Sequence, residues 1–233
     1  LHHDPDSPET ALLWLATADD LVRVEVTGGH AAPWRTEHPP DLVTGHGVAE
    51  PGMVMGNLVL SRAVDQRAAP RLWVGTSQGL FSLSLGGVAT SPAWESFADI
   101  PANSLLAMAV GPSGGLWLGG WDGCLRCLRS GCMEHLMPTL PAPVLALSQG
   151  SKDGWWAVTL DGLYRGHSEG WSLVLPRSRL PLGCSLRTVA EDSAGRLWLG
   201  TSTGLRVYDL ESERLLTTGS SFSLPVSALA YQA

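Results

Sequence analysis

The stretch GRLWLGTSTGLRVYDLESERLL, residues 195–216, contains the pattern that decides the fold. It reads as a turn, an apolar strand, a tight turn, a second apolar strand, a charged turn and a further short strand. The same order of apolar and turn residues recurs elsewhere in the 233-residue chain, so that five copies align. Their tryptophans are Trp14, Trp73, Trp117, Trp156 and Trp198. The chain is therefore a repeat protein.

Each conserved feature of the copies has a physical reason. Four copies carry a small residue two positions after the tryptophan: Ala16, Gly75, Gly119 and Gly200. Residues two apart on a strand share a face, so the indole ring lies beside a residue with little or no side chain. This arrangement allows neighbouring sheets to pack closely. Six positions after the tryptophan comes a residue suited to the positive φ of a tight hairpin: Asp20, Gly79, Gly123, Gly162 or Gly204. The apolar residue that follows is Leu21, Leu80, Cys124, Leu163 or Leu205.

An apolar segment precedes most of the tryptophan strands, and a weaker fourth strand follows the hairpin. A unit of about 45 residues with four short antiparallel strands is typical of a β-propeller blade. No segment shows sustained helical periodicity. The sequence therefore predicts an all-β fold, a single β-propeller domain over residues 1–233 with five blades of four antiparallel strands.

The two ends of the chain complement each other. Residues 1–11 contain no first strand of a blade, whereas residues 225–230 read as a first strand that no tryptophan strand follows. Pairing of residues 225–230 with the Trp14 strand would complete the first blade and close the ring. An excised piece with a whole number of repeats would show the same complementarity, so a larger propeller is the alternative.

Composition excludes several classes of protein. Hydrophobic residues make up 44% of the chain and charged residues 16%, which excludes a disordered chain. The net charge is −7 and there is no run of Lys or Arg, so neither nucleic acid nor an anionic membrane is an expected partner. No apolar stretch reaches the roughly 20 residues of a membrane span, and no signal peptide is visible. We therefore expect no direct insertion into a membrane.

The cysteines raise the question of a metal or redox site. Cys124 and Cys127 have the C-x-x-C spacing of zinc knuckles and redox motifs. Residues three apart on a strand point to opposite faces, which favours free, buried or half-buried thiols for these two and for Cys132 and Cys184. A metal site or disulfide is the alternative. We expect no metal and no cofactor.

Residues 185–209, SLRTVAEDSAGRLWLGTSTGLRVYD, resemble the two-component regulator propeller repeat. They contain its apolar strand, its E/D-D-x-x-G turn, and its L-W-[IL]-G-T and G-[LI]-x-x-[YF] strands. The resemblance implies a sensory or ligand-binding propeller, in a periplasmic or other extracytoplasmic position, that serves a bacterial signalling module.

A weaker likeness concerns residues 110–120, VGPSGGLWLGG, which are similar to the G-P-x-G-x-L-W turn of streptogramin lyase propellers. Those enzymes are metal-dependent and use histidines from several blades. Here His38 and His46 share one loop, so the catalytic roles do not carry over.

Propellers bind on the face formed by the hairpins between second and third strands and by the connections between blades, a location given by fold analogy. Trp121 and Asp122, in the stretch GGWDG, occupy such a hairpin. Trp121 lies outside the repeated tryptophan position, so it is a candidate for stacking on a ligand or anchoring a partner. The alternative is that it packs beneath the long connection 38–57.

Three further candidates lie on the same predicted face. Arg177 and Arg179 form its only basic pair and suit a carboxylate or phosphate, although a solvated loop explains them equally well. Asp161 is a hairpin carboxylate. His46 lies in the connection 38–57, whose length suggests a lid or a contact arm.

The function expected from these features is a non-enzymatic propeller that binds a small molecule or a protein partner on this face. The alternative is an enzyme acting on a glycan or cyclic peptide through the hairpin carboxylates Asp20, Asp122 and Asp161. Glycoside cleavage would require two of these carboxylates about 5–10 Å apart.

Overall fold

The structure is a computed structural model. It describes residues 2–3, 10–16, 21–27, 30–31, 35–37, 43–44, 48–49, 55–61, 71–76, 79–84, 94–97, 105–111, 115–129, 132–136, 139–151, 154–167, 170–217, 224–227 and 229. The chain forms two compact units, residues 1–103 and 104–233. Across the described residues, no helix is long and apolar enough to cross a membrane.

The first unit contains two larger antiparallel sheets and one small hairpin. The first sheet consists of β1 (His2–His3), β2 (Thr10–Ala16), β3 (Leu21–Thr27), β4 (His30–Ala31) and β5 (Arg35–Glu37). The small hairpin pairs β6 (Val43–Thr44) with β7 (Val48–Ala49). The second sheet has the order β11-β10-β9-β8, with β8 (Met55–Ser61), β9 (Arg71–Thr76), β10 (Gly79–Ser84) and β11 (Trp94–Phe97).

The start of the chain differs from the sequence prediction. Residues 1–11 were expected to contain no strand before the Trp14 strand, but β1 pairs with β2 through His2–Leu12 and His3–Ala11. The predicted pairing of residues 225–230 with the Trp14 strand, and the closure of a five-bladed ring, stay predictions.

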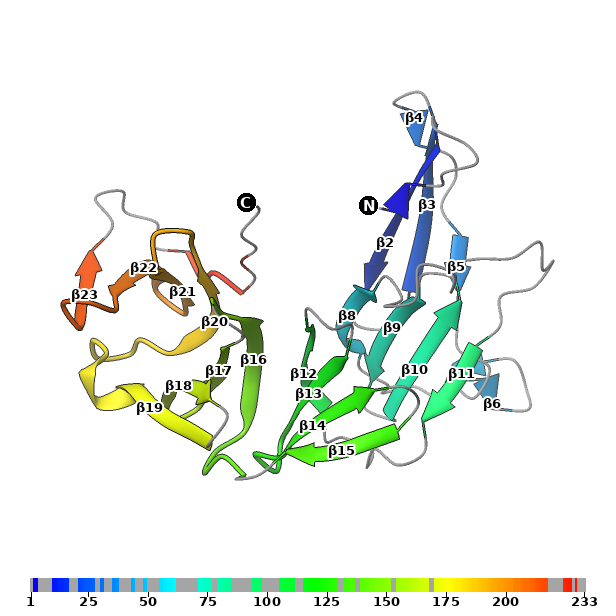
Figure 1. Cartoon of the computed structure of the whole chain (residues 1–233). Coiled ribbons are helices and arrows are strands. Elements are labelled where there is room, and N and C mark those ends of the chain that lie inside the picture. The colour runs from blue at the N-terminus through cyan, green and yellow to red at the C-terminus, as the bar shows by residue number, and fades with distance from the viewer. Residues whose placement is uncertain are drawn as a thin grey trace. The chain divides into compact units, whose positions relative to one another are not determined.

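The second unit contains three antiparallel sheets of four strands, each a meander in chain order (Figure 1). The third sheet consists of β12 (Leu105–Val110), β13 (Leu116–Gly120), β14 (Leu125–Arg129) and β15 (Cys132–Leu136). The fourth consists of β16 (Val144–Gln149), β17 (Trp155–Thr159), β18 (Gly162–His167) and β19 (Gly170–Pro176). The fifth consists of β20 (Leu186–Glu191), β21 (Arg196–Thr201), β22 (Gly204–Asp209) and β23 (Arg214–Thr217). This is the predicted four-stranded repeat, and the fold is all-β.

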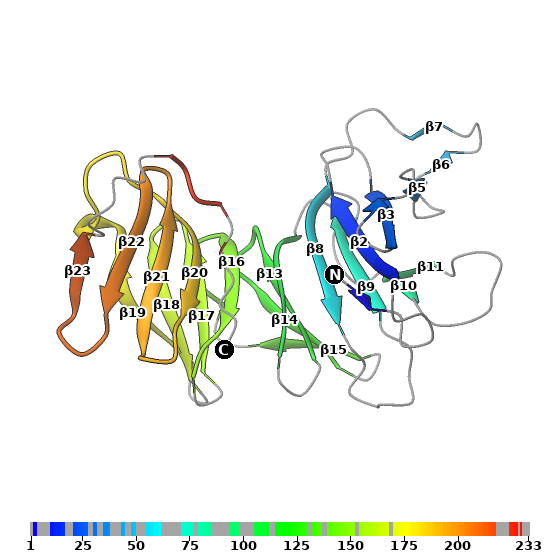
Figure 2. The same cartoon turned by 90° about the horizontal axis from the view of Figure 1, so that it is seen from above.

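Successive sheets of the second unit pack through their first strands, since β12 lies against β16 and β16 against β20. Figure 2 shows β20 to β23 as one sheet beside the fourth sheet. Their apolar side chains form the core between the sheets. One buried cluster includes Trp156, Val158, Leu163, Leu186 and Leu199.

The small residue of the repeat allows this close packing. A Cβ atom on Gly119 would lie 2.5 Å from Cγ1 and 2.8 Å from Cβ of Val144, the first residue of the next sheet. A Cβ atom on Gly200 would lie 3.0 Å from Cγ1 and 2.6 Å from the carbonyl oxygen of Val226. The Val226 amide also donates to the carbonyl of Thr201 at 3.0 Å. Val226 therefore packs against Gly200 of the fifth sheet as Val144 packs against Gly119 of the third sheet.

The junction between the fourth and fifth sheets departs from this rule. By strand register, Val158 occupies the position of Gly119 and Gly200, and Leu186 occupies that of Val144. Both side chains are buried in one cluster. Two larger side chains therefore replace the glycine–valine contact at this junction.

The hairpins that follow the tryptophan strands explain two more residues of the repeat. Thr201 donates through Oγ1 to the carbonyl of Gly204 at 2.7 Å, and Thr159 Oγ1 accepts from the Gly162 amide at 3.2 Å, which closes two-residue turns. The hairpin glycines have the positive φ that the sequence predicted: Gly79 at 131°, Gly123 at 73°, Gly162 at 157° and Gly204 at 120°.

The third sheet corrects one detail of the repeat alignment. Its hairpin contains three residues between Gly120 and Cys124, whose backbones pair at 3.0 Å, rather than two. Leu125 consequently faces Gly119, as Leu205 faces Gly200. The buried position that the sequence alignment assigned to Cys124 belongs to Leu125, which is fully buried.

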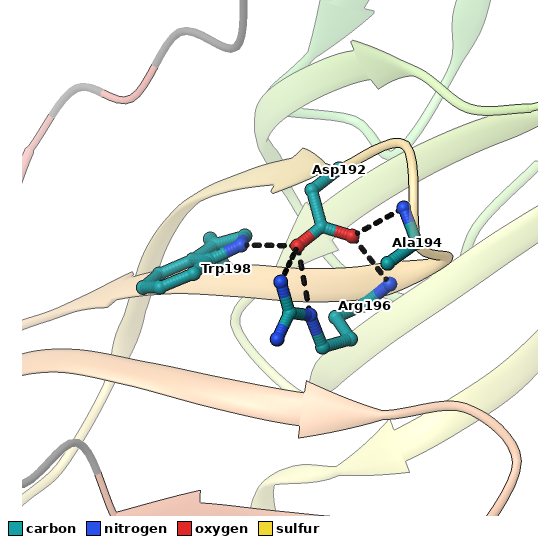
Figure 3. Close-up of polar contacts among 4 residues, drawn as sticks. All are labelled: Asp192, Ala194, Arg196 and Trp198. Atoms are coloured by element: carbon teal, nitrogen blue, oxygen red, sulfur yellow. Dashed lines mark hydrogen bonds and ion pairs between the residues drawn. The ribbon is translucent and has the colours of Figure 1, made fainter.

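The turn before the Trp198 strand is organised around Asp192 (Figure 3). Its Oδ1 accepts hydrogen bonds from the amides of Ala194 and Arg196, at 2.9 and 3.0 Å. Its Oδ2 accepts from Trp198 Nε1 at 2.9 Å and from the Arg196 guanidinium at 2.8 and 2.9 Å. The Trp198 indole and the Arg196 and Ala194 donors together lower the pKa of Asp192 from 3.8 to about 2. This carboxylate orients the repeated tryptophan.

A second carboxylate joins the fourth and fifth sheets. Glu191, at the end of β20, accepts hydrogen bonds from Trp156 Nε1 at 2.6 Å and from the Ser151 amide at 3.0 Å. Burial opposes ionisation, but the Ser151 and Trp156 donors hold the pKa of Glu191 below its ordinary value. The indole of one sheet is therefore satisfied by an acid of the next.

The substitution Gly119→Ala should lower the free energy of unfolding by about 2 kcal/mol, because the new methyl group overlaps Val144 in a filled core. Chemical denaturation measures the change. In the background Val144→Gly the same substitution should cost much less, since both Cγ1 and Cβ of residue 144 are then absent. Additive effects of the two substitutions would contradict the proposed contact.

The substitution Asp192→Asn should lower the free energy of unfolding at pH 7 by about 2 kcal/mol, because an amide NH2 would face donors. The folded-state pKa lies below the ordinary value of 3.8, so the stabilisation is complete above that value and is lost as the pH falls towards 2. Thermal melts from pH 7 to pH 2 should show the difference between the two proteins shrinking below about pH 4. Glu211→Gln, on an exposed turn of the same sheet, serves as the control.

Candidate functional site

The hairpins and the connections between sheets meet at one end of the second unit. Four backbone hydrogen bonds of 2.7–3.0 Å tie each hairpin to a neighbouring connection: Leu140 to Gly123, Arg177 to Asp161, Ser202 to Ser185 and Val226 to Thr201. We call this surface the hairpin end, and it comprises residues 120–124, 159–162, 176–187, 201–204 and 224–226. It corresponds to the binding face expected from the sequence.

Large apolar side chains are exposed at the hairpin end. Trp121 is 60% exposed, Leu160 44%, Leu224 74%, and Leu182 is fully exposed. Leu160 and Trp121 lie at hairpin tips, whereas the two other leucines lie in connections. Two other exposed leucines of this unit, Leu173 and Leu216, lie outside the hairpin end.

The geometry of the third hairpin explains why Trp121 is exposed. Its three-residue loop ends in Gly123, whose positive φ suits the left-handed position of such loops. Because of the additional residue, the loop that contains Trp121 does not have the register of the two-residue hairpins. The exposure agrees with a side chain outside the repeated tryptophan position. Of connection 38–57 the structure describes only residues 43–44, 48–49 and 55–57, so the alternative contact stays a prediction.

Asp122 is held within its own hairpin. Its carboxylate accepts from the Cys124 amide at 3.0 Å and from Arg126 Nη2 at 2.8 Å. Burial opposes ionisation, yet the hydrogen bonds from Arg126 and Cys124 hold the pKa of Asp122 below its ordinary value. Asp122 is thus an ionised turn residue whose oxygens already have donors.

Asp161 is held in the same way in the fourth sheet. It accepts hydrogen bonds from Thr159 Oγ1 and, at 2.8 Å, from the Tyr164 hydroxyl. Burial and the neighbouring Asp161 carboxylate raise the pKa of Tyr164 to about 12. Tyr164 therefore remains a donor to Asp161 over the whole accessible pH range.

The structure separates Arg177 from Arg179. Both lie in a 3-10 turn, η2 (Arg177–Arg179), where residues two apart point to different sides. Arg177 lines a cavity at the hairpin end and directs Nη1 to the Leu160 carbonyl at 3.5 Å. Arg179 donates to the Glu213 carbonyl at 2.9 Å and lines a separate groove with Arg165. The two arginines do not act as a pair.

The cavity that contains Arg177 lies between the fourth and fifth sheets and encloses about 250 Å³. Its lining residues are Leu145, Thr159, Leu160, Gly162, Arg177, Leu180, Ser185, Leu186 and Arg187. Sequence reasoning missed Arg187, although a charged residue inside the apolar strand LRTVAE was a usable signal. It also missed the four leucines that line the cavity, because a leucine is normally expected in the core.

Two sequence candidates lie outside the described residues, namely His46 and Asp20. Among the described residues, three cysteines are free thiols, namely Cys124, which is half-buried, and Cys127 and Cys184, which are buried. Burial raises the pKa of Cys127. For Cys184, burial is outweighed by hydrogen bonds from Thr203 and Thr201, and the pKa is lowered. In the described part of the chain no group of three His, Cys, Asp or Glu is arranged to hold a metal ion.

Comparison with known proteins agrees with the repeat found in the sequence. Residues 180–203 match the family model described as two component regulator propeller. No curated protein matches the chain in sequence.

Several solved structures resemble the chain. The extracellular domain of the hybrid two component system BT3049 from B. thetaiotaomicron superposes with a TM-score of 0.65 at 14% identity, over 93% of this chain and 28% of that one. PorZ, a surface component of the type-IX secretion system of Porphyromonas gingivalis, gives 0.63 at 13% identity, over 97% and 35%. Virginiamycin B lyase from Staphylococcus aureus gives 0.61 at 11% identity, over 88% and 65%.

These structures are β-propellers, and at such identities the likeness concerns the fold. The chain spans less than two thirds of the length of each. It therefore has the sheet architecture of bacterial sensor propellers and of lyase propellers alike.

Replacement of the exposed tryptophan should leave the fold intact. Trp121→Ala should change the free energy of unfolding by less than about 0.5 kcal/mol, because its side chain is mostly in solvent. Trp156→Ala should lower it by about 4 kcal/mol, because this indole is buried and bonded to Glu191. Urea denaturation of the two variants measures both, and a large loss in Trp121→Ala would place that side chain in the core.

Proposed function

We propose that the chain is a non-enzymatic binding propeller whose hairpin end takes a small molecule or a protein partner. One observation carries this proposal. Four large apolar side chains are exposed at that end, and one of them, Leu160, lines a cavity with Arg177 and Arg187, which form no ion pair with the described residues. Such a surface has binding groups that the fold itself does not use.

The assembly that this propeller serves is, in our proposal, a bacterial sensory or multiprotein one outside the cytoplasm. The match of residues 180–203 to the two component regulator propeller supports a sensory role. The neighbours named as extracellular domains and as a surface component support the location. Five blades in a closed ring remain our preferred architecture. The contact of Val226 with Gly200 supports a further junction of the same kind after the fifth sheet.

The second candidate is an enzyme acting from the propeller face, which the likeness to virginiamycin B lyase favours. The ion pair of Asp122 with Arg126 argues against it, because, despite burial, it holds the pKa of this carboxylate below its ordinary value. A carboxylate with a lowered pKa is a weak general base and does not supply the proton that a general acid must donate.

A ligand screen on the purified chain tests the proposal. Compounds that raise the melting temperature should be followed by amide hydrogen exchange. A bound ligand should slow exchange in residues 120–124, 159–162 and 176–187 and stabilise the chain in proportion to its occupancy, with no turnover. Protection confined to other residues would refute the site. Turnover that Asp122→Asn or Asp161→Asn abolishes would instead establish the enzyme.

A further inference from the structure

The cavity between the fourth and fifth sheets opens where the repeat is broken. At the other two described junctions of this unit a valine packs against a glycine of the preceding sheet, which allows a close approach. Here Val158 and Leu186 face each other instead. The cavity lies next to both, with Thr159, Leu160 and Leu186 in its wall. The cavity therefore lies at the described junction of this unit where two larger side chains replace the glycine–valine contact.

Two guanidinium groups border this cavity without a carboxylate partner. Arg177 and Arg187 are both exposed, and neither forms an ion pair in the part of the chain that the structure describes. Asp161, the acid next to the cavity wall, accepts hydrogen bonds from Thr159 and Tyr164 and forms no ion pair with either arginine among the described residues. The described lining of the cavity therefore holds two arginines with one neighbouring carboxylate, an excess of positive charge in a chain whose net charge is −7.

The rest of the wall is mainly aliphatic. Four leucines, Leu145, Leu160, Leu180 and Leu186, line the cavity together with Thr159, Gly162 and Ser185, and no described lining residue is aromatic. The volume of about 250 Å³ is below the range of drug-sized pockets, so the occupant is small. Branched aliphatic groups fill such a space, whereas a flat ring would find no aromatic face to stack on.

We propose that this cavity binds a carboxylate that carries a short branched aliphatic chain. Arg177 and Arg187 would hold the carboxylate through charge-assisted hydrogen bonds, for which the planar guanidinium fork is suited. The aliphatic chain would lie against the leucines. This chemistry is shared by a free branched acid and by the C-terminal leucine of a peptide. The proposal rests on the proposed function and names the ligand class of the same site.

Calorimetric titration with matched probes tests the ligand class. The probes are 4-methylpentanoate and acetyl-Gly-Leu, each compared with its amide, which has nearly the same shape and no charge. Each acid that binds should do so at least about tenfold more tightly than its amide. Tight binding of only the peptide acid would identify a chain terminus as the natural source, and tight binding of only the free acid would identify a metabolite. Equal affinity of acid and amide would overturn the proposal.

Three variants assign the binding to this cavity. Arg177→Met and Arg187→Met should each weaken binding of the acid about tenfold, with little effect on the amide. Arg179→Met, on the same short turn but outside the cavity, should change it less than about twofold. All three side chains are exposed, so the variants should fold. Loss of affinity in Arg179→Met alone would place the ligand in the other groove and refute the assignment.

Failure of this proposal is distinguishable from failure of the proposed function. If no probe binds at up to about 10 mM, yet another ligand from the screen slows exchange in residues 159–162 and 176–187, the ligand class is wrong and the binding function stands. If no ligand protects the hairpin end, both are wrong.

Discussion

The close approach of successive sheets over a glycine is the constraint on which the second unit depends. Gly119 and Gly200 leave spaces that Val144 and Val226, respectively, fill. The fit brings apolar side chains of adjacent sheets into one core and positions each hairpin beside the next connection. Because an added methyl group would overlap backbone or β-branched atoms, the repeat tolerates only small residues where the approach is this close.

The candidate site arises from two departures from that regular repeat. The third sheet has one additional hairpin residue, which exposes Trp121. The fourth sheet has Val158 in place of glycine, and a cavity lies beside it. The residues that follow the repeat stabilise the fold. The residues at the two departures contribute exposed apolar side chains and arginines that take no part in the core. This division between scaffold and site is common in repeat architectures.

Much of the fold could be predicted from the sequence because the repeat reports local geometry. The period of the tryptophans, the small residue after them and the hairpin glycine each correspond to one structural need, and the sheets of the second unit have that form. The candidate site was harder to predict from the sequence than the fold. The additional residue before Cys124 was hidden because a glycine still stood six positions after Trp117, so Leu125 was overlooked. Arg187 was missed because cavities depend on what faces a strand across a junction, and spacing within one strand does not report this.

The Glu191 bridge has a consequence for how the protein opens. Its carboxylate belongs to the fifth sheet but accepts the indole proton of Trp156 and an amide of the fourth. Detachment of either sheet would break both hydrogen bonds and expose the apolar cluster that the two sheets share. Nearest-neighbour coupling of this kind makes a linear array melt as a block, so these two sheets should lose structure in a single cooperative step instead of peeling away in turn.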